Sequence, residues 1–564
     1  MIANRSKLQK LLADALVCHG AGRLMDAERL YRQVLAQDSK NADGLHLLGV
    51  VAYQTGRYAV AIDLILKAIG IRGEVALFYT NLGNALHKSG RSEDAVAAYF
   101  RSLSLDAESV AAYGNLAVAL TELGQPAAAA KVCLHALCLG PDYLDGHCNL
   151  GNASHKAALP NQAAVSFRRA LRIDHSCVRA LCNLSAAFKD LDRFLDAEGY
   201  AKRAVVLQTD DAESLSNIAT SLSARGQLGL AMRLHDRALA LDPGRPLLRA
   251  NAAHTLFCLG RLRDGWQAWE SRVIPDRFSA LPRWDGCPAP DKTILVWKEQ
   301  GVADQLLSLS MVADAVRVVG SLVVECDPRM VDLVARSFPE VTVLPHMLPP
   351  HPLCEAADAH LPMFSLGAYC RNELTDFPRH DGYLRPEPKK VAYWKSWLNT
   401  LGPGVKVGLS WRSMSGQLAD FLPSLERLQP VLSLPGTIFV NLQYGAAEEE
   451  IEAFWRRNGI RIHIPSGLDV TDDFDGLAGL IGALDMVTGT STTASILAGA
   501  VGRPTLMYMY YPVYNENRML GQDYMPWHPS ARIVTYGYGE DLDLLVKRYV
   551  ERLSGFIAQL QASD

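Results

Sequence analysis

Hydroxyl side chains and one arginine are concentrated at two points where an apolar, strand-like segment ends. Residues 407–413 read VGLSWRS and residues 487–495 read VTGTSTTAS. Ligands of parallel α/β sheets bind at the carboxyl ends of the strands, where the amides of a helix N-terminus can also hold an anion. An arginine adds charge-assisted hydrogen bonds to a phosphate. The sequence therefore predicts an anion-binding site whose ligands are Ser410, Arg412, Ser413, Thr490, Ser491, Thr492 and Thr493.

A column of primary amides suggests a second chemistry, the binding of an extended chain. Asparagine returns every 34 residues, at Asn81, Asn115, Asn149, Asn183, Asn217 and Asn251. An amide offers a donor and an acceptor side by side, so it can pair with a peptide unit whatever the bound chain's side chains are. We favour this interpretation because buried helix contacts are normally made by apolar groups. The alternative is internal, with each amide tying its helix to the backbone of the next repeat.

The amides belong to a wider repeat of the same period. A small-residue column reads Ala15, Gly49, Gly83, Ala117, Gly151, Ser185, Ala219 and Ala253, and an alanine column reads Ala27, Ala61, Ala95, Ala129, Ala163, Ala197 and Ala231. This pattern resembles tetratricopeptide repeats, which are helix–turn–helix units that stack into a superhelix. With its amide column, the arm resembles that of protein O-GlcNAc transferases. The resemblance implies a protein-binding arm over residues 1–275, with about seven to eight repeats and an aromatic cap at Trp266 and Trp269.

After the arm, the periodicity changes to that of alternating strands and helices. Residues 276–291 are rich in proline and turn residues and indicate a linker. Short apolar strands then alternate with helical segments over residues 292–402 and again over 403–564, which is typical of parallel β-α units. The predicted strands are 292–297, 321–325, 341–344, 405–410, 438–442, 461–464, 486–488 and 504–509. The predicted helices are 303–318, 328–337, 477–484, 493–500 and 542–560. The predicted fold is multidomain: an all-α tetratricopeptide superhelix, then a two-lobed α/β region of twin Rossmann type. It resembles a metal-independent glycosyltransferase of the GT-B type.

The opening strand and loop of the first lobe carry a more specific resemblance. Residues 294–304 read ILVWKEQGVAD, similar to the segment that opens the fold of bacterial ADP-heptose:lipopolysaccharide heptosyltransferases, except that Ala303 replaces a glycine. The resemblance implies that Asp304 is the general base that deprotonates an acceptor hydroxyl. A helix-capping role for this aspartate is the alternative. Gln300 in the same loop is a candidate donor ligand, and His360 is a candidate second acid or base.

Two segments of the second lobe bear on the identity of the donor. Residues 439–445, FVNLQYG, resemble the strand and loop that hold the nucleotide base, with Gln443 and Tyr444 as its ligands. In the heptosyltransferase pattern an Asp precedes the threonine of the hydroxyl loop and a His follows it by four residues, whereas here Ser491 and Ile496 stand in those places. These departures count against ADP-heptose. An all-hydroxyl loop better suits a donor with an extra carboxylate, such as pseudaminic or legionaminic acid, which are nonulosonic acids activated as CMP esters.

The composition excludes several other classes of protein. A net charge of -4 gives no field that would hold nucleic acid or an anionic membrane. There is no apolar signal core at the start, and no uncharged apolar run is long enough to span a bilayer. The eleven cysteines form no C-x-x-C pair and indicate a reducing compartment, so we expect a cytoplasmic protein. Asp473-Phe-Asp475 matches a metal-binding pattern but precedes a helix, so we expect it to cap that helix and we expect no metal.

Joined on one chain, the arm and the α/β region resemble the tetratricopeptide glycosyltransferases that bacteria use to modify flagellin in the cytoplasm before export. The implied reaction moves a sugar from a nucleotide donor, with no further cofactor, to serine or threonine hydroxyls of a protein held along the groove. Two alternatives remain open. One is an O-GlcNAc-transferase-like or glycan-acceptor enzyme that uses a UDP- or ADP-sugar. The other is a non-catalytic adaptor, which Ala303 and Ser491 favour and Asp304 and Arg412 oppose.

Overall fold

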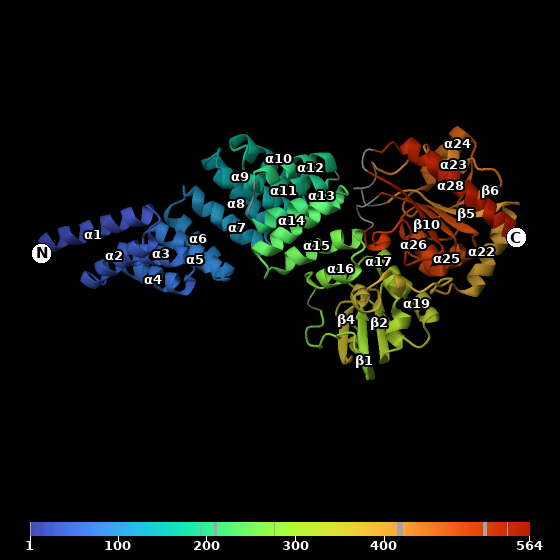
Figure 1. Cartoon of the computed structure of the whole chain (residues 1–564), viewed down its shortest axis with the longest axis horizontal. Coiled ribbons are helices and arrows are strands. Elements are labelled where there is room, and N and C mark those ends of the chain that lie inside the picture. Colours follow the sequence, from blue (N-terminus) through green and yellow to red (C-terminus); the bar gives the residue numbers. More distant parts are fainter. Residues whose placement is uncertain are drawn as a thin grey trace. The chain divides into compact units, whose positions relative to one another are not determined.

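The computed structural model describes residues 2–191, 193–207, 211–275, 277–413, 421–510, 516–537 and 540–563. The chain forms two compact units, Met1–Gln208 and Thr209–Asp564. In its described part the first unit contains only helices, and the second contains four more helices followed by two parallel sheets (Figure 1). The predicted order, helical repeats first and parallel α/β structure second, is confirmed at that level.

The first unit consists of helix pairs. They are α1 (Ile2–Gly20), α2 (Leu24–Gln37), α3 (Ala42–Gln54), α4 (Tyr58–Ile71), α5 (Ala76–Lys88), α6 (Ser92–Leu105), α7 (Val110–Glu122), α8 (Pro126–Leu139), α9 (Leu144–Lys156), α10 (Pro160–Ile173), α11 (Val178–Asp190) and α12 (Phe194–Val206). Small residues let the helices of a pair approach closely: a methyl group on Gly83 would lie 2.5 Å from Cε1 of Tyr99, and one on Gly151 would lie 2.5 Å from Cε1 of Phe167. The alanine column is buried in the same interfaces, as at Ala95. The two predicted columns are therefore the packing surfaces of the repeats.

Four helices of the same kind begin the second unit. They are α13 (Ala212–Ala224), α14 (Leu228–Leu241), α15 (Pro246–Cys258) and α16 (Leu262–Trp269). The predicted aromatic cap is α16, where the buried Trp266 ring lies 4.8 Å from that of Phe257 and 5.2 Å from that of Phe364 in the α/β region. Its Nε1 donates a hydrogen bond to the Arg371 carbonyl at 2.7 Å. Because this cap is buried against the α/β region, the last helices share a compact unit with the sheets.

The first sheet, sheet A, has four parallel strands in the order β3-β2-β1-β4. They are β1 (Ala289–Trp297), β2 (Val319–Cys326), β3 (Thr342–Pro345) and β4 (Ala359–Pro362), of which β4 was not predicted. The helix predicted over 303–318 is broken into α17 (Val302–Leu309) and α18 (Val312–Val316). At the break, the Ser310 hydroxyl donates to the Leu307 carbonyl and competes with the helical pattern. The other short helices of this region are η1 (Pro328–Met330), α19 (Val331–Ser337), α20 (Pro352–Glu355), η2 (Met363–Leu366), α21 (Gly367–Cys370) and η3 (Leu374–Asp376).

The segment predicted as a linker packs against sheet A in its described part, residues 277–291, and its last three residues begin β1. Asp276 lies outside the described residues. The Phe278 ring lies 5.6 Å from the Trp297 ring, and the Arg277 guanidinium forms an ion pair at 2.8 Å with the fully buried Glu325 on β2. This correction has a simple cause. The segment is rich in turn residues, but it also contains Arg277 and Phe278, whose side chains cover buried residues of sheet A.

The second sheet, sheet B, has six parallel strands in the order β10-β9-β8-β5-β6-β7. They are β5 (Val405–Ser410), β6 (Thr437–Asn441), β7 (Ile462–His463), β8 (Met486–Thr490), β9 (Thr505–Tyr510) and β10 (Ala531–Tyr536), of which β10 was not predicted. The helices are α22 (Pro388–Thr400), α23 (Gln429–Leu432), α24 (Glu448–Asn458), α25 (Phe474–Ala483), α26 (Thr493–Val501), α27 (Glu516–Met519) and α28 (Leu542–Ser563). Strands β6 and β7 extend the sheet on one side of β5, and β8 to β10 extend it on the other. The chain therefore reverses direction across the sheet between β5 and β8, as in doubly wound sheets.

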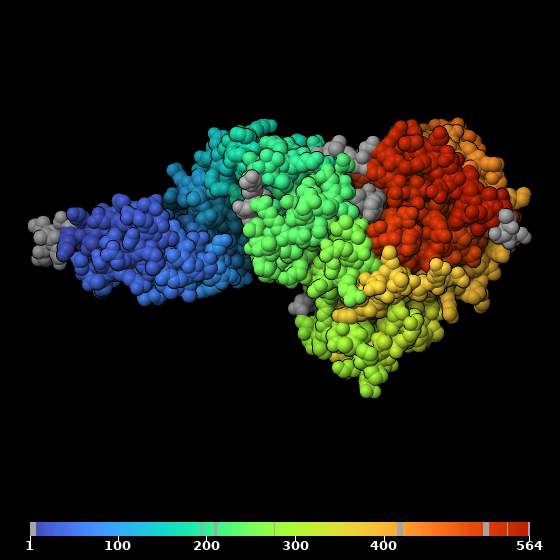
Figure 2. Space-filling model, viewed as in Figure 1, coloured from blue at the N-terminus to red at the C-terminus, as the bar shows by residue number. Residues whose placement is uncertain are grey.

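Helices cover both faces of sheet B. On one face, Val487 of β8 shares a buried core with Ile496 of α26. On the other, the Thr488 hydroxyl is 2.6 Å from the Tyr549 hydroxyl of α28. The same buried core contains Leu306 of α17, and α17 packs directly against α26, so the two sheet regions are in contact; Figure 2 shows their surfaces meeting.

Three predictions outside the site can be compared with the structure. Asp473 caps α25, because its carboxylate accepts a hydrogen bond from the Gly476 amide at 2.7 Å, which confirms the capping interpretation. None of the eleven cysteines, all of which lie in described segments, forms a disulfide. Among the helices of the described segments, none has the length and apolar character needed to cross a bilayer.

Candidate functional site

The reversal between β5 and β8 brings the two predicted anion-binding segments together. Ser410 at the end of β5 is the register partner of Gly489 on β8, so residues 410–413 and 490–493 leave the sheet at the same edge. In doubly wound sheets, the crevice at such a reversal is where ligands bind. Residues about eighty positions apart in the sequence thus form one site at the carboxyl edge of sheet B.

The loop after β8 uses part of its hydroxyl set to begin α26. The Thr492 hydroxyl accepts a hydrogen bond from the Ser495 amide at 3.4 Å, and the Ser495 hydroxyl accepts one from the Thr492 amide at 2.8 Å. This reciprocal pair is a capping box. The Oγ1 atoms of Thr490 and Thr493 make no hydrogen bond to a described residue, although Thr490 is only 5% exposed. Capping therefore occupies Thr492, and the other two threonine hydroxyls are available to a ligand.

Arg518 is a further member of this site that the sequence analysis missed. It lies on α27, shortly after β9, and its Nη1 donates a hydrogen bond to the Ser491 hydroxyl at 2.6 Å. The sequence did contain an indication of this position. Arg518 follows the predicted strand 504–509, and side chains that follow a parallel strand lie at the carboxyl edge of its sheet. Since β9 is the direct neighbour of β8, such a cation reaches the hydroxyl loop.

Gln443 is hydrogen-bonded to the backbone of two loops at this edge of sheet B. It is 1% exposed, and its Oε1 accepts hydrogen bonds from the backbone amides of Trp411 at 3.0 Å and Arg412 at 2.9 Å. Its Nε2 donates to the Tyr444 carbonyl at 3.2 Å. The side chain thus helps to order the loop after β5, and its role as a ligand of the nucleotide base stays a prediction.

Arg412 lies at the predicted place but is paired within sheet B. Its Nη1 donates to the Glu450 carboxylate at 2.8 Å and its Nη2 to the Ala446 carbonyl at 3.0 Å. Both side chains of the ion pair are one-third exposed. An ion pair with this exposure is weak, so a phosphate could compete with Glu450 for the guanidinium. No helix was predicted at α24, so Glu450 was not expected at this site.

The remaining predicted ligands of this edge differ in exposure. Ser410 is fully buried, and its hydroxyl lies 3.4 Å from the Gln443 Oε1 atom, so it supports the loop from beneath. Ser413 and Tyr444 are half-buried. The structure therefore brings these three residues to the site, but only the last two lie near its surface.

Asp304 occupies the first turn of α17 and is half-buried. The residue before the helix, Gly301, has no side chain to cap it, so Asp304 is the acidic group next to the positive end of the helix dipole. Gln300 lies in the preceding loop, where its carbonyl accepts a hydrogen bond from Gln305 at 3.1 Å. Because α17 packs against α26, the helix that carries the predicted base contacts the helix whose first turn carries the hydroxyl loop.

His360 is not placed with Asp304. It is the register partner of Leu295 on β1, and Leu295 belongs to the face of sheet A that contacts Phe278, whereas α17 covers the opposite face. Its Nδ1 accepts a hydrogen bond from the Trp297 indole at 2.9 Å, and burial, aided by the charge of Arg283, lowers its pKa. The structure therefore does not bring His360 together with Asp304, and its role as a second acid or base stays a prediction.

A buried ion pair at the carboxyl edge of sheet A was also missed. Sheet A reverses between β1 and β4, and the crevice there contains Glu299, whose side chain is 3% exposed. Arg272, which follows α16, donates to Glu299 at 2.6 Å and to the Ser365 hydroxyl at 2.8 Å. Burial raises the pKa of Glu299, and Arg272 opposes that rise. The protein's own arginine thus fills this crevice.

The asparagine column combines parts of both predicted interpretations. Five amides donate through Nδ2 to the preceding repeat, not to the next one: Asn81 to His46 (2.8 Å), Asn115 to Asn84 (2.9 Å), Asn149 to the Gly114 carbonyl (3.1 Å), Asn183 to Asn152 (2.7 Å) and Asn251 to Ser216 (3.0 Å). The side chain of Asn217 makes no hydrogen bond to a described residue. None of the six Oδ1 atoms accepts a hydrogen bond from a described residue. Five of the six Nδ2 groups therefore link neighbouring repeats, whereas the Oδ1 atoms remain available to accept hydrogen bonds from a bound chain.

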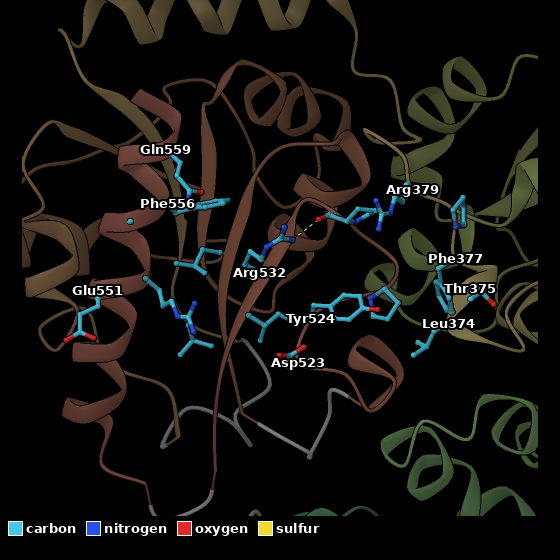
Figure 3. A pocket seen from close by; sticks show the side chains of 18 residues that line it. Leu374, Thr375, Phe377, Arg379, Asp523, Tyr524, Arg532, Glu551, Phe556 and Gln559 are labelled. Carbon is cyan, nitrogen blue, oxygen red and sulfur yellow. Dashed lines mark hydrogen bonds between the residues drawn. The ribbon is translucent and has the colours of Figure 1, made fainter. Parts of the chain in front are cut away.

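A large cavity lies away from these residues. It has a volume of about 1430 Å³ and is bounded by α28, the first half of β10 and the loop at residues 374–379. Figure 3 shows Arg532 between Phe556 of α28 and the Tyr524 ring. None of the predicted site residues lines it. The volume of a cavity does not by itself indicate a reaction or a ligand, so the carboxyl edge of sheet B remains the candidate site.

Comparisons with known proteins identify the helical half. Models of the tetratricopeptide repeat match residues 19–75, 80–143 and 212–241. The helical half is a tetratricopeptide-repeat arm. The chain is 34% identical over 362 residues to Protein FlbA of Caulobacter vibrioides, a match that covers 59% of this chain and 60% of FlbA. The chain therefore aligns with only about three-fifths of that relative.

Similarity to solved structures is limited. The MamA protein covers 30% of this chain at 22% identity and a TM-score of 0.28, with 92% of MamA aligned. A tetratricopeptide repeat protein from Parabacteroides merdae covers 44% at 12% identity and a TM-score of 0.40, with 99% of that chain aligned.

Proposed function

We propose that the chain is a protein O-glycosyltransferase of the metal-independent, two-lobed GT-B type. In this proposal the carboxyl edge of sheet B binds a CMP-activated nonulosonic acid, and the tetratricopeptide arm binds a protein acceptor such as flagellin in the cytoplasm. The observation that carries the proposal is the reversal between β5 and β8, which gathers Arg412, Arg518 and the hydroxyl loop at one sheet edge.

The charges and dipoles at this edge suit a departing nucleotide. The first turn of α26 directs backbone amides outward, and Arg412 and Arg518 add guanidinium donors. Donors already in place where negative charge develops stabilise the transition state without reorganisation. In this proposal they hold the CMP phosphate as its bond to the sugar breaks.

The chemical step needs one base. The acceptor serine or threonine oxygen attacks the anomeric carbon, the bond between that carbon and the phosphate oxygen breaks, and CMP leaves with the bonding electrons. The hydroxyl proton passes to the Asp304 carboxylate. Support for this role comes from the half-buried position of Asp304 in the first turn of α17, the helix that contacts α26.

A transfer assay tests the proposal directly. Purified flagellin is incubated with the protein and, separately, with CMP-pseudaminic acid, UDP-GlcNAc or ADP-heptose, and the intact mass of the flagellin is measured. We expect a mass increase of one nonulosonate residue, or multiples of it, with the CMP donor alone. Transfer only from a UDP- or ADP-sugar would support the alternative enzyme class. Capture of flagellin without transfer from any donor would support the adaptor.

The same assay tests the base. Asp304→Asn should reduce transfer by about a hundredfold or more, because general base catalysis typically contributes that much. Donor binding, measured by titration calorimetry, should be nearly unchanged, since the base acts on the acceptor proton. Transfer within a few-fold of the original protein would remove Asp304 from the mechanism.

A further inference from the structure

We infer that the cavity between α28, β10 and the loop at residues 374–379 binds an acidic peptide segment of a partner protein. This inference goes beyond the proposed function and does not depend on it. Leu506 and Arg532, the second residues of β9 and β10, line the cavity, whereas the candidate donor site lies where the strands of sheet B end. The two sites are therefore at different ends of the strands.

Three arginines from three different segments line this cavity, which we call the arginine groove. They are Arg379 on the loop, Arg532 on β10 and Arg552 on α28. All three side chains are exposed, and none of them forms an ion pair with a described residue. Arg329 at sheet A, by contrast, is paired with Asp327 at 2.9 Å. The groove therefore presents positive charge that no described carboxylate pairs with.

The guanidinium of Arg532 is oriented but not fully used. Its Nη1 donates to the Pro529 carbonyl at 2.8 Å and to the Ala531 carbonyl at 3.2 Å, and its Nε and Nη2 donate to no described residue. The remaining donors can bind a carboxylate. The Tyr524 ring, which is 40% exposed, and the Phe556 ring line the groove beside it (Figure 3). The groove thus combines sites for carboxylates with apolar contact surface.

Gly555 keeps the α28 side of the groove open. A glycine inside a helix costs stability, so it usually has a local reason. Gly83 and Gly151 have one in the close approach of a neighbouring ring, but a methyl group on Gly555 would meet nothing within 4 Å. Packing inside the protein therefore does not explain Gly555. The missing side chain leaves room in the groove beside Arg552.

The size and the mixed charge of the groove favour a peptide over other anions. Its volume of about 1430 Å³ exceeds the range of small-molecule pockets, about 300–1,000 Å³. Asp523 and Glu551 also line it, and they would repel a nucleic acid strand, which carries a phosphate at every nucleotide. A peptide whose carboxylates are separated by apolar residues can pair with the three arginines and avoid the two acids.

The test begins with a phage-displayed library of short random peptides, selected on the full chain. A variant in which Arg379, Arg532 and Arg552 are all changed to Gln removes peptides that bind elsewhere, including the tetratricopeptide arm. We expect the remaining peptides to be enriched in Asp and Glu. Fluorescence anisotropy of the synthetic peptides then gives dissociation constants. Each single Arg→Gln change should weaken binding about two- to fivefold, and the triple change about tenfold or more.

A matched control removes the same net charge away from the groove. Arg456, Arg457 and Arg461, on α24 and in the turn after it, are changed together to Gln; none of them lines the groove. The selected peptides should bind this variant as they bind the original protein. Thermal melting shows whether each variant remains folded.

Gly555 allows the sign of the charge to be tested at one position. Gly555→Glu and Gly555→Lys both place a long helix-forming side chain in the groove, so both should melt at or above the temperature of the original protein. Gly555→Lys should bind the selected peptides several times more tightly than Gly555→Glu, because the added charges have opposite signs. Equal binding by the two variants would contradict charge as the basis of recognition.

Three further results would overturn the inference. They are a selection with no enrichment of Asp and Glu, selected peptides that bind the triple variant as tightly as the original protein, and a single-stranded DNA oligonucleotide that binds the groove more tightly than these peptides. None of them bears on sugar transfer to flagellin, so the proposed function is tested separately.

Discussion

At the scale of single residues, two arginine–glutamate ion pairs differ in how far their side chains are buried. Arg412 and Glu450 are one-third exposed, whereas Arg272 and Glu299 are 11% and 3% exposed. Opening the exposed pair costs little, because surface ion pairs contribute about 1 kcal/mol or less. Opening the buried pair costs more, because either partner alone would be an uncompensated buried charge.

The buried pair leads to a stability prediction. Arg272→Ala should lower the free energy of unfolding by about 3–5 kcal/mol, the usual cost of leaving a buried charge unpaired. Arg261→Ala is the matched control, because Arg261 pairs with Asp264 at the surface, where such pairs contribute about 1 kcal/mol or less. Urea unfolding of both variants measures the difference. Equal effects would show that Arg272 is not structurally important.

The same variant has a predictable pH dependence. Burial already raises the pKa of Glu299 above its usual 4.5, and Arg272 is the main group that opposes this rise. Without Arg272 the pKa rises further, so the carboxyl is protonated more readily in the folded state. A raised folded-state pKa stabilises the protein below that pKa and costs stability as the pH rises through it. The stability deficit of Arg272→Ala should therefore be larger at pH 7 than at pH 5.

At the scale of elements, the sequence predicted all the central strands but missed two of the four edge strands. The core strands β1, β5, β8 and β9 are apolar runs, and each was predicted within a few residues. The missed strands β4 and β10 end their sheets in the order of pairing. Edge strands carry polar residues that blunt their exposed edge, so their hydrophobic signal is weak.

The residues of the candidate site could be predicted only where the strand or helix that carries them had a clear sequence pattern. Thr490 to Thr493 and Arg412 follow strands that could be predicted, so their sheet edge could be predicted too. Glu450 and Arg518 lie on helices that gave no clear signal, and the pairing of Arg412 with Glu450 depends on packing that no local pattern encodes. The role of Gln443 was missed because a buried hydrogen-bonding amide and a ligand-binding amide have the same sequence signature.

The small residues between the two helices of a repeat should be needed for close packing. Gly151→Ala should destabilise the first unit by about 1–3 kcal/mol, because the added methyl overlaps the Phe167 ring and overpacking has that cost. Gly199→Ala in α12 is the control, since nothing lies within 4 Å of its added methyl. Alanine is the better helix former there, so stability should rise by about 0.5–1 kcal/mol. Thermal melting that falls for both variants alike would contradict close packing as the reason for the small column.

At the scale of the whole molecule, a repeat arm and an α/β region with a candidate ligand-binding edge belong to one chain. The last two helix pairs lie in the same compact unit as the sheets, and the turn between α15 and α16 supports the segment that carries Arg518. The end of the arm and sheet B therefore belong to one compact unit. The function of the arm then depends on what the asparagine column binds.

The asparagine column allows the two roles of its amides to be separated, because its members are not equivalent. Asn149 and Asn183 each donate one hydrogen bond to the preceding repeat, whereas Asn217 donates none to a described residue. Changing Asn149 or Asn183 to alanine should remove about 0.5–1.5 kcal/mol of stability, partly offset by the better helix propensity of alanine. Asn217→Ala should leave stability unchanged or slightly improved.

Binding of the acceptor should respond differently from stability. If the Oδ1 atoms accept hydrogen bonds from the backbone of an extended chain, each of the three variants should weaken flagellin binding by a similar factor, about fivefold for 1 kcal/mol. Thermal melting and the dissociation constant for flagellin are measured on the same three proteins. Weakened binding in Asn217→Ala with unchanged melting can arise only from a contact with the acceptor. Normal binding in that variant, together with lower melting temperatures in the other two, would show that the amides hold the repeats together and nothing else.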